Sequence, residues 1–163
     1  MKTKILDSDT IAARADTLRA EGRELVLTNG CFDLLHVGHV RYLQSARALG
    51  DALVVAINGD ASVRSLKGDG RPLNSESDRA EVIAALECVD FVVVFPEVRV
   101  TRVLEKIQPS IYVKGGDYTP DTLNPEERQV LDKIGATIRI LPFEQGHSTS
   151  GLIDRMKGAP PVG

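Results

Sequence analysis

The chain has 163 residues and a formal net charge of −3, from 20 Lys and Arg against 23 Asp and Glu. This length suits one domain, because a domain of this size buries roughly 70% of the surface that its unfolded chain exposes. A mildly acidic chain lacks the dense cationic face that binds nucleic acid or an anionic membrane surface. We therefore expect neither nucleic acid nor a membrane as a partner.

The apolar segments and the cysteines indicate the cellular compartment in which the protein is found. The longest uninterrupted apolar run, residues 52–57, has six residues, whereas a membrane helix needs roughly 20. The first residues carry charge but lack the apolar segment of a secretion signal. Cys31 and Cys88 lie far apart in no metal-binding spacing, which fits a reducing compartment. The sequence therefore predicts a cytoplasmic protein.

Strand-like and helix-like segments alternate along the chain. Short, β-branched apolar runs predict strands at residues 24–28, 52–57, 91–95, 111–114 and 137–141. Apolar residues at helical spacing predict helices at residues 11–18, 40–47, 82–86, 100–107, 130–134 and 149–156. Because parallel strands need long crossovers, this order predicts a Rossmann-like α/β fold: a three-layer α/β/α arrangement around a five-stranded parallel sheet. We expect a single domain at residues 1–157 and a flexible tail at residues 158–163.

Polar residues and glycines follow three of the predicted strands. Residues 29–33 follow the first strand, residues 58–60 the second and residues 115–117 the fourth. Ordinary turn chemistry explains such residues, because Gly and Asn readily adopt positive φ. Ligands of open α/β sheets, however, bind outside the carboxyl ends of the strands. Three such ends on one rim favour a binding site, where glycine lets a ligand approach the backbone.

Two histidines, His36 and His39, lie at the predicted turn from the first strand into its helix. Three residues apart at a helix start, their imidazoles can face the same side, near backbone N–H groups that favour anions. The pair therefore predicts a phosphate site. Two other interpretations stay open: ordinary capping and surface roles, or a transition-metal site with Asp33 as a third ligand.

Two further features are compatible with an anion. Arg79 falls on the apolar stripe of its predicted helix, where it snorkels, pairs with Asp78 or Glu81, or directs its guanidinium at phosphate. Ser148 and Thr149 precede the last helix, where they serve as helix caps or as a phosphate cradle.

The run Asn-Gly-Cys-Phe-Asp-Leu-Leu-His-Val-Gly-His at residues 29–39 resembles the signature of the cytidylyltransferase-like nucleotidyltransferases. Later blocks follow the order of that family over roughly residues 4–157; they are Asn58-Gly59-Asp60, Lys67 with Arg71-Pro72, Asp78-Arg79, Lys114-Gly-Gly-Asp117 and Gly146-His-Ser-Thr149. Within the family, residues 66–74 and 114–118 are most similar to the adenylyltransferases of ADP-heptose synthesis. Cys31, where many cytidylyltransferases have Thr, also favours that branch. A start at Met1, directly before the first helix, resembles the stand-alone form, with the sugar kinase encoded separately.

The resemblance implies a reaction. AMP passes from ATP to D-glycero-β-D-manno-heptose 1-phosphate by direct in-line attack, giving ADP-heptose and pyrophosphate for lipopolysaccharide core or another surface glycan. The alternative within the family is a cytidylyltransferase that joins CTP to glycerol 3-phosphate or a related alcohol phosphate. A third interpretation is a regulatory module that binds nucleotide without catalysis. The retained histidines and cations argue against this interpretation.

The resemblance also implies roles for individual residues. The catalytic set is His36, His39, Lys67 and Arg79, with Lys67 acting from a mobile loop and Arg79 holding the β- and γ-phosphates. The nucleotide contacts are Asn29, Gly30, Cys31, Phe32, Gly38, Lys114, Gly116, Asp117, Ser148 and Thr149. Gly38 would leave room for the base or ribose, and base choice would rest on residues 114–118 and 143–147.

The acceptor is expected to contact Asp33, Asp60 and Arg71, and Asp33 would orient either a histidine or the substrate. Mg²⁺ would bridge the nucleotide phosphates with no firm protein ligand, although Asp60 and Asp117 are candidates for helping to hold it. The family often forms homodimers. The apolar run at residues 92–95 would suit such an interface, although a buried strand explains that run equally well.

Overall fold

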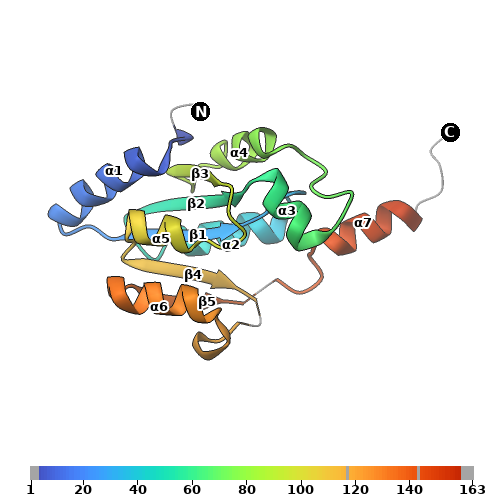
Figure 1. Cartoon of the computed structure of the whole chain (residues 1–163). Coiled ribbons are helices and arrows are strands. Elements are labelled where there is room, and N and C mark those ends of the chain that lie inside the picture. The colour runs from blue at the N-terminus through green and yellow to red at the C-terminus, as the bar shows by residue number, and fades with distance from the viewer. Residues whose placement is uncertain (1–3, 117, 143, 159–163) are drawn as a thin grey trace.

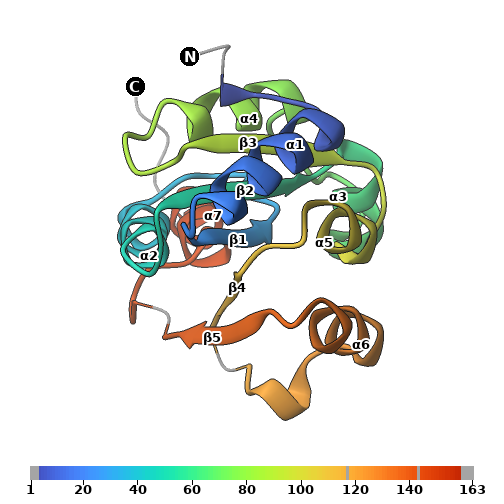
Figure 2. The same ribbon diagram turned by 90° about the vertical axis from the view of Figure 1, so that its left-hand side faces the viewer.

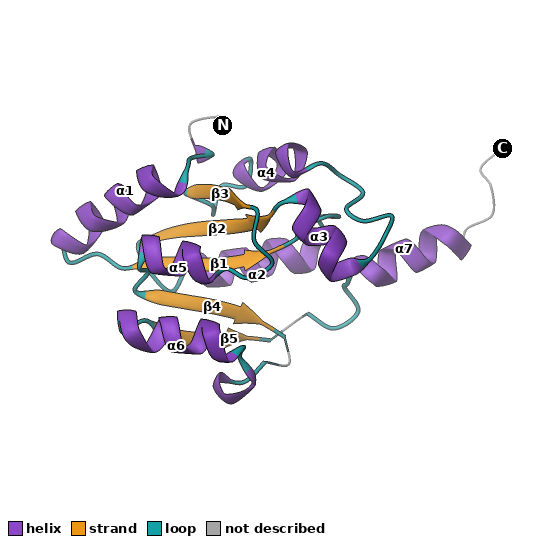
Figure 3. Ribbon diagram, in the orientation of Figure 1, coloured by secondary structure: helices purple, strands orange, loops and turns teal. Residues whose placement is uncertain are grey.

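The computed structural model describes residues 4–116, 118–142 and 144–158. Strands and helices alternate along the chain as predicted (Figure 3). The strands are β1 (Leu25–Gly30), β2 (Ala52–Asn58), β3 (Phe91–Phe95), β4 (Ile111–Gly115) and β5 (Thr137–Leu141). The helices are α1 (Ser8–Ala20), α2 (Val37–Arg47), α3 (Asp60–Lys67), α4 (Glu76–Ala84), α5 (Thr101–Ile107), α6 (Pro125–Ile134) and α7 (Thr149–Gly158), with a short 3₁₀ turn η2 (Pro120–Thr122).

The five strands form one parallel sheet in the order β3-β2-β1-β4-β5. From β1 the chain first adds strands on one side and then on the other, so β1 and β4 flank the point where the order reverses. The carboxyl ends of the strands point toward the side of the molecule that carries α3 and α7 (Figure 1). A crevice at such a switch point is where open α/β sheets bind ligands. The predicted Rossmann-like fold is confirmed.

Helices cover both faces of the sheet, and alternate strand residues feed two separate cores. Leu27 and Val54 pack with α1, α5 and α6, whereas Val26 and Val55 pack with α2 and α4. Figure 2 shows α1, α5 and α6 on one side of the sheet and α2 and α7 on the other. A strand buried on both faces reads as a continuous apolar run, which is why β2 was visible in the sequence.

Several bounds differ from the prediction by one to six residues, and three differences matter for the site and the tail. β1 continues to Gly30, so Asn29 and Gly30 belong to the strand and do not follow it. α3 was not predicted, because Ser62 and Val63 are its only buried residues and they give no apolar stripe. α7 extends through Gly158, which was assigned to the tail, and the remaining tail residues lie outside the described part.

The edge strand β3 bears on the predicted dimer interface. Val92, Val93 and Phe95 are buried inside the chain, and Val92 is covered at the sheet edge by a bridge to Ile5. A buried strand therefore accounts for this run. Within the described residues, no helix is long and apolar enough to cross a membrane.

Candidate active site

The two histidines of the signature lie stacked where β1 leads into α2. Their ring centroids are 3.8 Å apart with 28° between the planes. His36 is the N-cap of α2, and its backbone N–H donates to Nδ1 of His39 at 3.3 Å. The ring of His147, just before α7, lies 6.4 Å from that of His36. The predicted placement of both imidazoles on one side is confirmed, and a third imidazole lies beside them.

Both imidazoles of the stack have a lowered pKa, which favours their neutral form near pH 7. Burial, followed by the charge of His36, lowers the pKa of His39 to about 4. Burial and the charge of His147 lower the pKa of His36. Because Nδ1 of His39 accepts a hydrogen bond, its ring hydrogen is assigned to Nε2. Nδ1 of His36 is buried and, among the described residues, has no hydrogen-bond partner.

Two signature glycines make room for side chains of the site itself. A Cβ at Gly38 would lie 2.9 Å from Nδ1 of His36 and 3.1 Å from Cβ of His147. A Cβ at Gly30 would lie 2.9 Å from the ring of Phe32, which packs edge-on against His39 with centroids 5.4 Å apart. The space that was predicted for the base or ribose at Gly38 is taken by these imidazoles here.

Asp33 holds a second loop in place. Its side chain is fully buried and accepts from Nε of Arg71 at 2.7 Å and from the backbone N–H groups of Leu73 and Asn74 at 2.8–3.0 Å. Burial raises its pKa, but the hydrogen bonds from Asn74, Leu73 and Arg71 outweigh burial, so the pKa is lowered. Of the two roles predicted for Asp33, orienting a histidine or orienting the substrate, the first is wrong, because its carboxylate faces the 71–74 segment.

Arg79 is a buried cross-link between three segments. Its side chain has no exposed surface. Nε donates to the carbonyl of Asn74 at 3.1 Å, Nη1 to the carbonyl of Cys31 at 2.6 Å and Nη2 to Oδ1 of Asp60 at 2.9 Å. The guanidinium thus ties the loop after β1 to the starts of α3 and α4.

This geometry corrects the predicted phosphate contact of Arg79. The inward orientation was expected from the apolar stripe, but the partner is Asp60 and not Asp78 or Glu81. Because the side chain has no exposed surface and each of its three nitrogens donates one hydrogen bond to the protein, we expect Arg79 to support the site and not to contact a ligand directly. Asp60 was predicted to contact the acceptor or metal. Its Oδ1 accepts from Arg79, and 37% of its side chain is exposed.

Lys67 is the last residue of α3, which corrects its assignment to a mobile loop. The helix begins with Glu76 accepting from the backbone N–H of Asp60 at 2.7 Å, and it ends at Gly68, whose φ is +93°. Lys67 is exposed, and it forms no ion pair with any described residue. Its ammonium is therefore available to a ligand.

A polar network lies at the carboxyl ends of β1 and β4. Nζ of Lys114 lies 3.6 Å from Oε2 of Glu127, 3.5 Å from the hydroxyl of Tyr112 and 4.9 Å from the ring centroid of Tyr118. The Tyr112 hydroxyl donates to Oδ1 of Asn29 at 2.7 Å. Burial, followed by the charge of Glu127, raises the pKa of Tyr112, so its hydroxyl stays protonated.

The other residues that were predicted to contact the nucleotide have different surroundings in the structure. Ser148 accepts from the N–H of Gly151 at 2.9 Å, and Thr149 donates to the carbonyl of Leu34 at 3.3 Å, so both hydroxyls serve the start of α7. Gly116 has φ of +88° and bonds to β5. Burial raises the pKa of the Cys31 thiol, which keeps it protonated. Asp117 and Phe143 lie outside the described residues.

Sequence reasoning missed Glu127, and it gave His147 only as one of the residues 143–147 expected to decide base choice. Glu127 lies on the buried stripe of α6, three and four residues before Val130 and Leu131, which is the same signal that pointed to Arg79. His147 lies inside a motif that was noted, but no periodicity indicates that its ring reaches His36. Both extend the site on the side of β4 and α7.

The alternative of a transition-metal site finds no support in the described residues. They contain no group of three His, Cys, Asp or Glu side chains that could hold a metal ion. Asp33, the proposed third ligand, accepts from Arg71 and the 71–74 backbone instead.

Comparison with known proteins finds relatives that are similar to this chain over most of its length. The bifunctional protein HldE of Geotalea uraniireducens (strain Rf4) is 50% identical over 154 residues, which are 94% of this chain and 31% of that protein. HldE of Geobacter metallireducens (strain ATCC 53774 / DSM 7210 / GS-15) is 46% identical over 153 residues, again 94% and 31%. The chain thus spans less than a third of the length of these relatives.

Solved structures agree. The lipopolysaccharide core biosynthesis protein from Thermoplasma volcanium GSS1 has a TM-score of 0.63 at 28% identity, covering 77% of this chain and 100% of that one. The pantoate-beta-alanine ligase from Francisella tularensis shares the fold, with a TM-score of 0.61 at 16% identity over 96% of this chain and 73% of that one. The sequence profile described as "Cytidylyltransferase-like" matches residues 27–155, most of the chain. The chain therefore belongs to the cytidylyltransferase-like family.

Proposed function

We propose that the protein is a nucleotidyltransferase that transfers AMP from ATP to D-glycero-β-D-manno-heptose 1-phosphate, releasing pyrophosphate and ADP-heptose. The observation that carries this proposal is the His36–His39 stack at the N-terminus of α2, beside the switch point of the sheet. The similarity to HldE over 94% of the chain supports the choice of sugar and nucleotide.

The site would act by positioning and by charge stabilisation. Backbone N–H groups at the start of α2 favour an anion, and Nε2–H of His39 is a donor for an oxygen of the α-phosphate. Negative charge grows on the phosphate oxygens during in-line transfer, so fixed donors in a partly buried site lower the barrier. A bound triphosphate would raise the pKa of either histidine, whereas two charged rings 3.8 Å apart would repel each other.

The triphosphate needs cations as well. Lys67 is exposed and without a carboxylate partner among the described residues, so it suits the β- or γ-phosphate. The start of α7, with Ser148 and Thr149, offers further N–H and hydroxyl donors. Leaving pyrophosphate would be held between these two elements.

Mg²⁺ would reach the site as part of the substrate MgATP. The described residues form no cluster of three candidate ligands, and Asp60 already pairs with Arg79. Because Mg²⁺ on nucleotide phosphates needs only one or two protein carboxylates, Asp60, whose side chain is 37% exposed, is the candidate among the described residues for helping to hold the metal.

The proposed reaction also sets requirements on the surroundings. A sugar 1-phosphate acceptor presupposes a sugar kinase earlier in the sequence of reactions, and ATP as a substrate suits the cytoplasm. Both cysteines are free thiols, which fits a reducing compartment.

The proposal is tested by a matrix of ATP and CTP against heptose 1-phosphate, glycerol 3-phosphate and ethanolamine phosphate, with pyrophosphate release as the readout. We expect turnover with ATP and heptose 1-phosphate, and none when either is omitted. A His39→Ala variant, assayed at the same protein concentration, controls for contaminating enzymes. Turnover with CTP but not ATP would replace the proposal by the cytidylyltransferase alternative.

A further inference from the structure

Glu127 is a nearly buried acid that the proposed mechanism does not use. It lies in the first turn of α6, and 7% of its side chain is exposed. Its sole ion pair among the described residues is with Lys114, whose Nζ lies 3.6 Å from Oε2. This distance is too long for a hydrogen bond. The carboxylate of Glu127 therefore has a cation beside it but accepts no hydrogen bond from any described residue.

The start of α6 does not need this carboxylate. Asn124 caps the helix, because its Oδ1 accepts from the backbone N–H groups of Glu126 and Glu127 at 2.9 and 3.4 Å. A buried ion pair without hydrogen bonds also adds little stability, because taking two charges out of water costs about as much as their attraction contributes. Neither the helix start nor the ion pair explains why an acid is buried here.

The carboxylate oxygens of Glu127 are open to a ligand. Among the described residues, Nδ1 of His36 is the one buried side-chain polar atom without a partner, so the oxygens of Glu127 are not sealed inside the protein. An ionised carboxylate accepts hydrogen bonds and donates none. A matching ligand group must therefore bring hydrogen-bond donors and no negative charge.

Glu127 also changes what Lys114 can attract. The ammonium lies between Glu127, the hydroxyl of Tyr112 at 3.5 Å and the ring of Tyr118 at 4.9 Å. The Lys114–Glu127 pair has no net charge, whereas the exposed Lys67 has no carboxylate partner among the described residues. A triphosphate is therefore attracted to Lys67, and the pair suits an uncharged part of the same ligand.

The Lys114–Glu127 pair lies across the switch point of the sheet from the histidine stack. Val113, just before Lys114, pairs with Thr28 of β1, and Tyr112 donates to Asn29. The helix that follows β1 is α2, which carries the histidines, whereas α6 follows β4, and Figure 2 shows these two helices on opposite faces of the sheet. A ligand in the crevice at this point meets α2 on one side and the pair on the other.

We infer that the carboxylate of Glu127 accepts hydrogen bonds from the 2′- and 3′-hydroxyls of the nucleotide's ribose, with Lys114 holding the carboxylate in place. Two neighbouring oxygens match two neighbouring hydroxyls, and an acid on a ribose hydroxyl is a general way in which open α/β sheets hold a nucleotide. The space at Gly38, which was considered for the ribose, is taken by imidazoles. The inference rests on the proposed function in taking a nucleotide as the ligand, and ATP and CTP share this ribose.

The test compares the wild type with Glu127→Gln on ATP, 2′-deoxy-ATP and 3′-deoxy-ATP. For each nucleotide, kcat/KM is measured from pyrophosphate release at saturating heptose 1-phosphate, and the dissociation constant is measured by calorimetry without the sugar. The readout is the ratio between ATP and each deoxy analogue. This ratio cancels any effect of the variant on folding or on the charge around Lys114, because such effects act on all three nucleotides alike.

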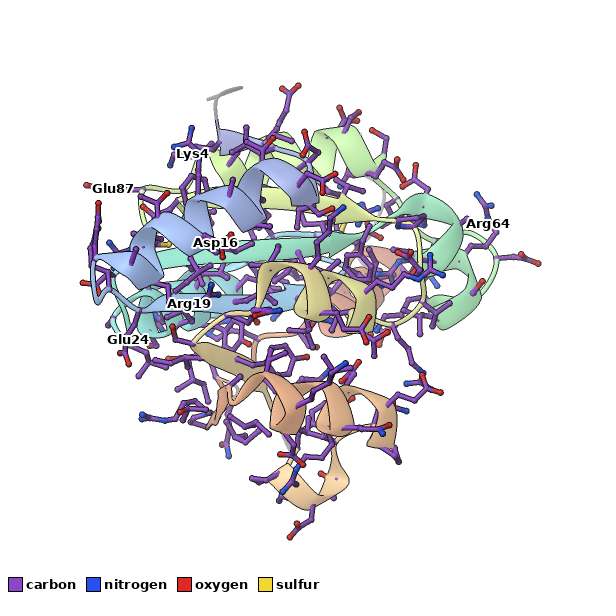
Figure 4. The ribbon with its side chains drawn as sticks, turned by 60° about the vertical axis from the view of Figure 1, so that its left-hand side comes forward. Lys4, Asp16, Arg19, Glu24, Arg64 and Glu87 are labelled. Atoms are coloured by element: carbon purple, nitrogen blue, oxygen red, sulfur yellow. The ribbon has the colours of Figure 1, made fainter. Side chains whose placement is uncertain are left out.

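Two exposed glutamates provide matched controls. Glu126→Gln makes the same change one residue away in α6, where the side chain is 72% exposed. Glu87→Gln makes it at a glutamate that projects from the surface at the opposite end of the molecule from Arg64 of α3 (Figure 4).

In the wild type we expect kcat/KM for at least one deoxynucleotide to be lower than for ATP by about tenfold or more, as when a hydrogen bond to a charged group is removed. In Glu127→Gln this ratio should fall below about threefold, because a neutral amide oxygen is a weaker acceptor than a carboxylate. Both controls should keep the wild-type ratio. KM for heptose 1-phosphate should change by less than about twofold in every variant.

Equal ratios in the wild type and Glu127→Gln would overturn the inference, and so would a wild type that uses both deoxynucleotides as well as ATP. A rise confined to KM for heptose 1-phosphate would assign Glu127 to the acceptor and overturn it too. Should Glu127→Gln fail to fold, the same criteria apply to Glu127→Asp, which withdraws the carboxylate by one methylene.

The calorimetric arm separates this inference from the proposed function. If the wild type binds ATP but does not turn over heptose 1-phosphate, the proposed function fails, while the ratios of the dissociation constants still decide the role of Glu127. A protein that binds CTP instead is measured with CTP and its deoxy analogues under the same criteria. A protein that binds neither nucleotide would contradict both.

Discussion

Two arginine–aspartate pairs lie on the same rim and are built as opposites. In the pair Arg79–Asp60 the cation is fully buried and the acid keeps 37% of its side chain exposed. In the pair Arg71–Asp33 the acid is fully buried and the cation keeps 18% exposed. Similar N–O distances, 2.9 and 2.7 Å, therefore accompany different surroundings.

The difference shows which partner is free to meet a ligand. A buried guanidinium surrounded by acceptors is satisfied by the protein and fixes the segments that it touches. A buried carboxylate surrounded by N–H donors is satisfied too, but it leaves the outer nitrogens of Arg71 unused. Sequence patterns identify both arginines as cations near the site, whereas burial separates Arg79, which is enclosed by the protein, from Arg71, which is partly exposed.

The largest expected effect comes from removing the buried cation. Arg79→Ala leaves the carbonyls of Cys31 and Asn74 without their donor and empties a buried position. We expect a loss of about 3 kcal/mol or more in the free energy of unfolding, measured by urea denaturation. A loss below about 1 kcal/mol would contradict the scaffold role.

The chemistry is expected to depend on the His36–His39 stack. His39→Ala should lower kcat by about 10² or more, because it removes a donor to the charge that develops in the transition state. Circular dichroism and the thermal midpoint should show a folded protein. Near-normal turnover by this variant would remove His39 from the mechanism.

Acidification provides a test that leaves the pairs intact. The pKa of His39 is about 4 in the folded protein against 6.5 for an ordinary histidine, so the unfolded chain binds more protons between these values. Stability must then fall as pH falls from 6.5 toward about 5, by at most about 1.4 kcal/mol per pH unit and by less for a partly exposed ring. Urea denaturation of His39→Asn over the same range should give a shallower slope, and an equal slope would show that His39 does not titrate this way.

The smallest expected effect is on stability at the other pair. Arg71→Ala removes one charge-assisted hydrogen bond, while Asp33 keeps the backbone N–H groups of Leu73 and Asn74. We expect a loss of about 1.5 to 2 kcal/mol in the free energy of unfolding. A loss as large as that of Arg79→Ala would erase the distinction between the two pairs.

Much of the fold could be predicted from local patterns. β2 and β3 are apolar runs because they are covered on both faces, and their helices carry apolar stripes. The helix α3 was not predicted, because few of its residues are buried and they form no apolar stripe. The placement of Arg79 on an apolar stripe did predict its burial, and the same signal at Glu127 was available.

The partners of the charged residues could not be predicted in the same way. Asp33 and Arg71 are 38 residues apart in the chain, and their contact depends on how the segment before α4 returns to the loop after β1. A carboxylate next to a signature histidine suggests a role toward that histidine, whereas backbone N–H groups from another segment compete for it. Such pairings follow from the tertiary fold and not from spacing.

The central claim is most directly tested by presenting ATP and CTP together, at equal concentrations, to the wild-type protein with D-glycero-β-D-manno-heptose 1-phosphate and following the products by ³¹P NMR. We predict that ATP is consumed, with pyrophosphate and ADP-heptose appearing in equal amounts, while the concentration of CTP stays unchanged. A cytidine diphosphate sugar as the product, or pyrophosphate formed without the sugar phosphate, would contradict it.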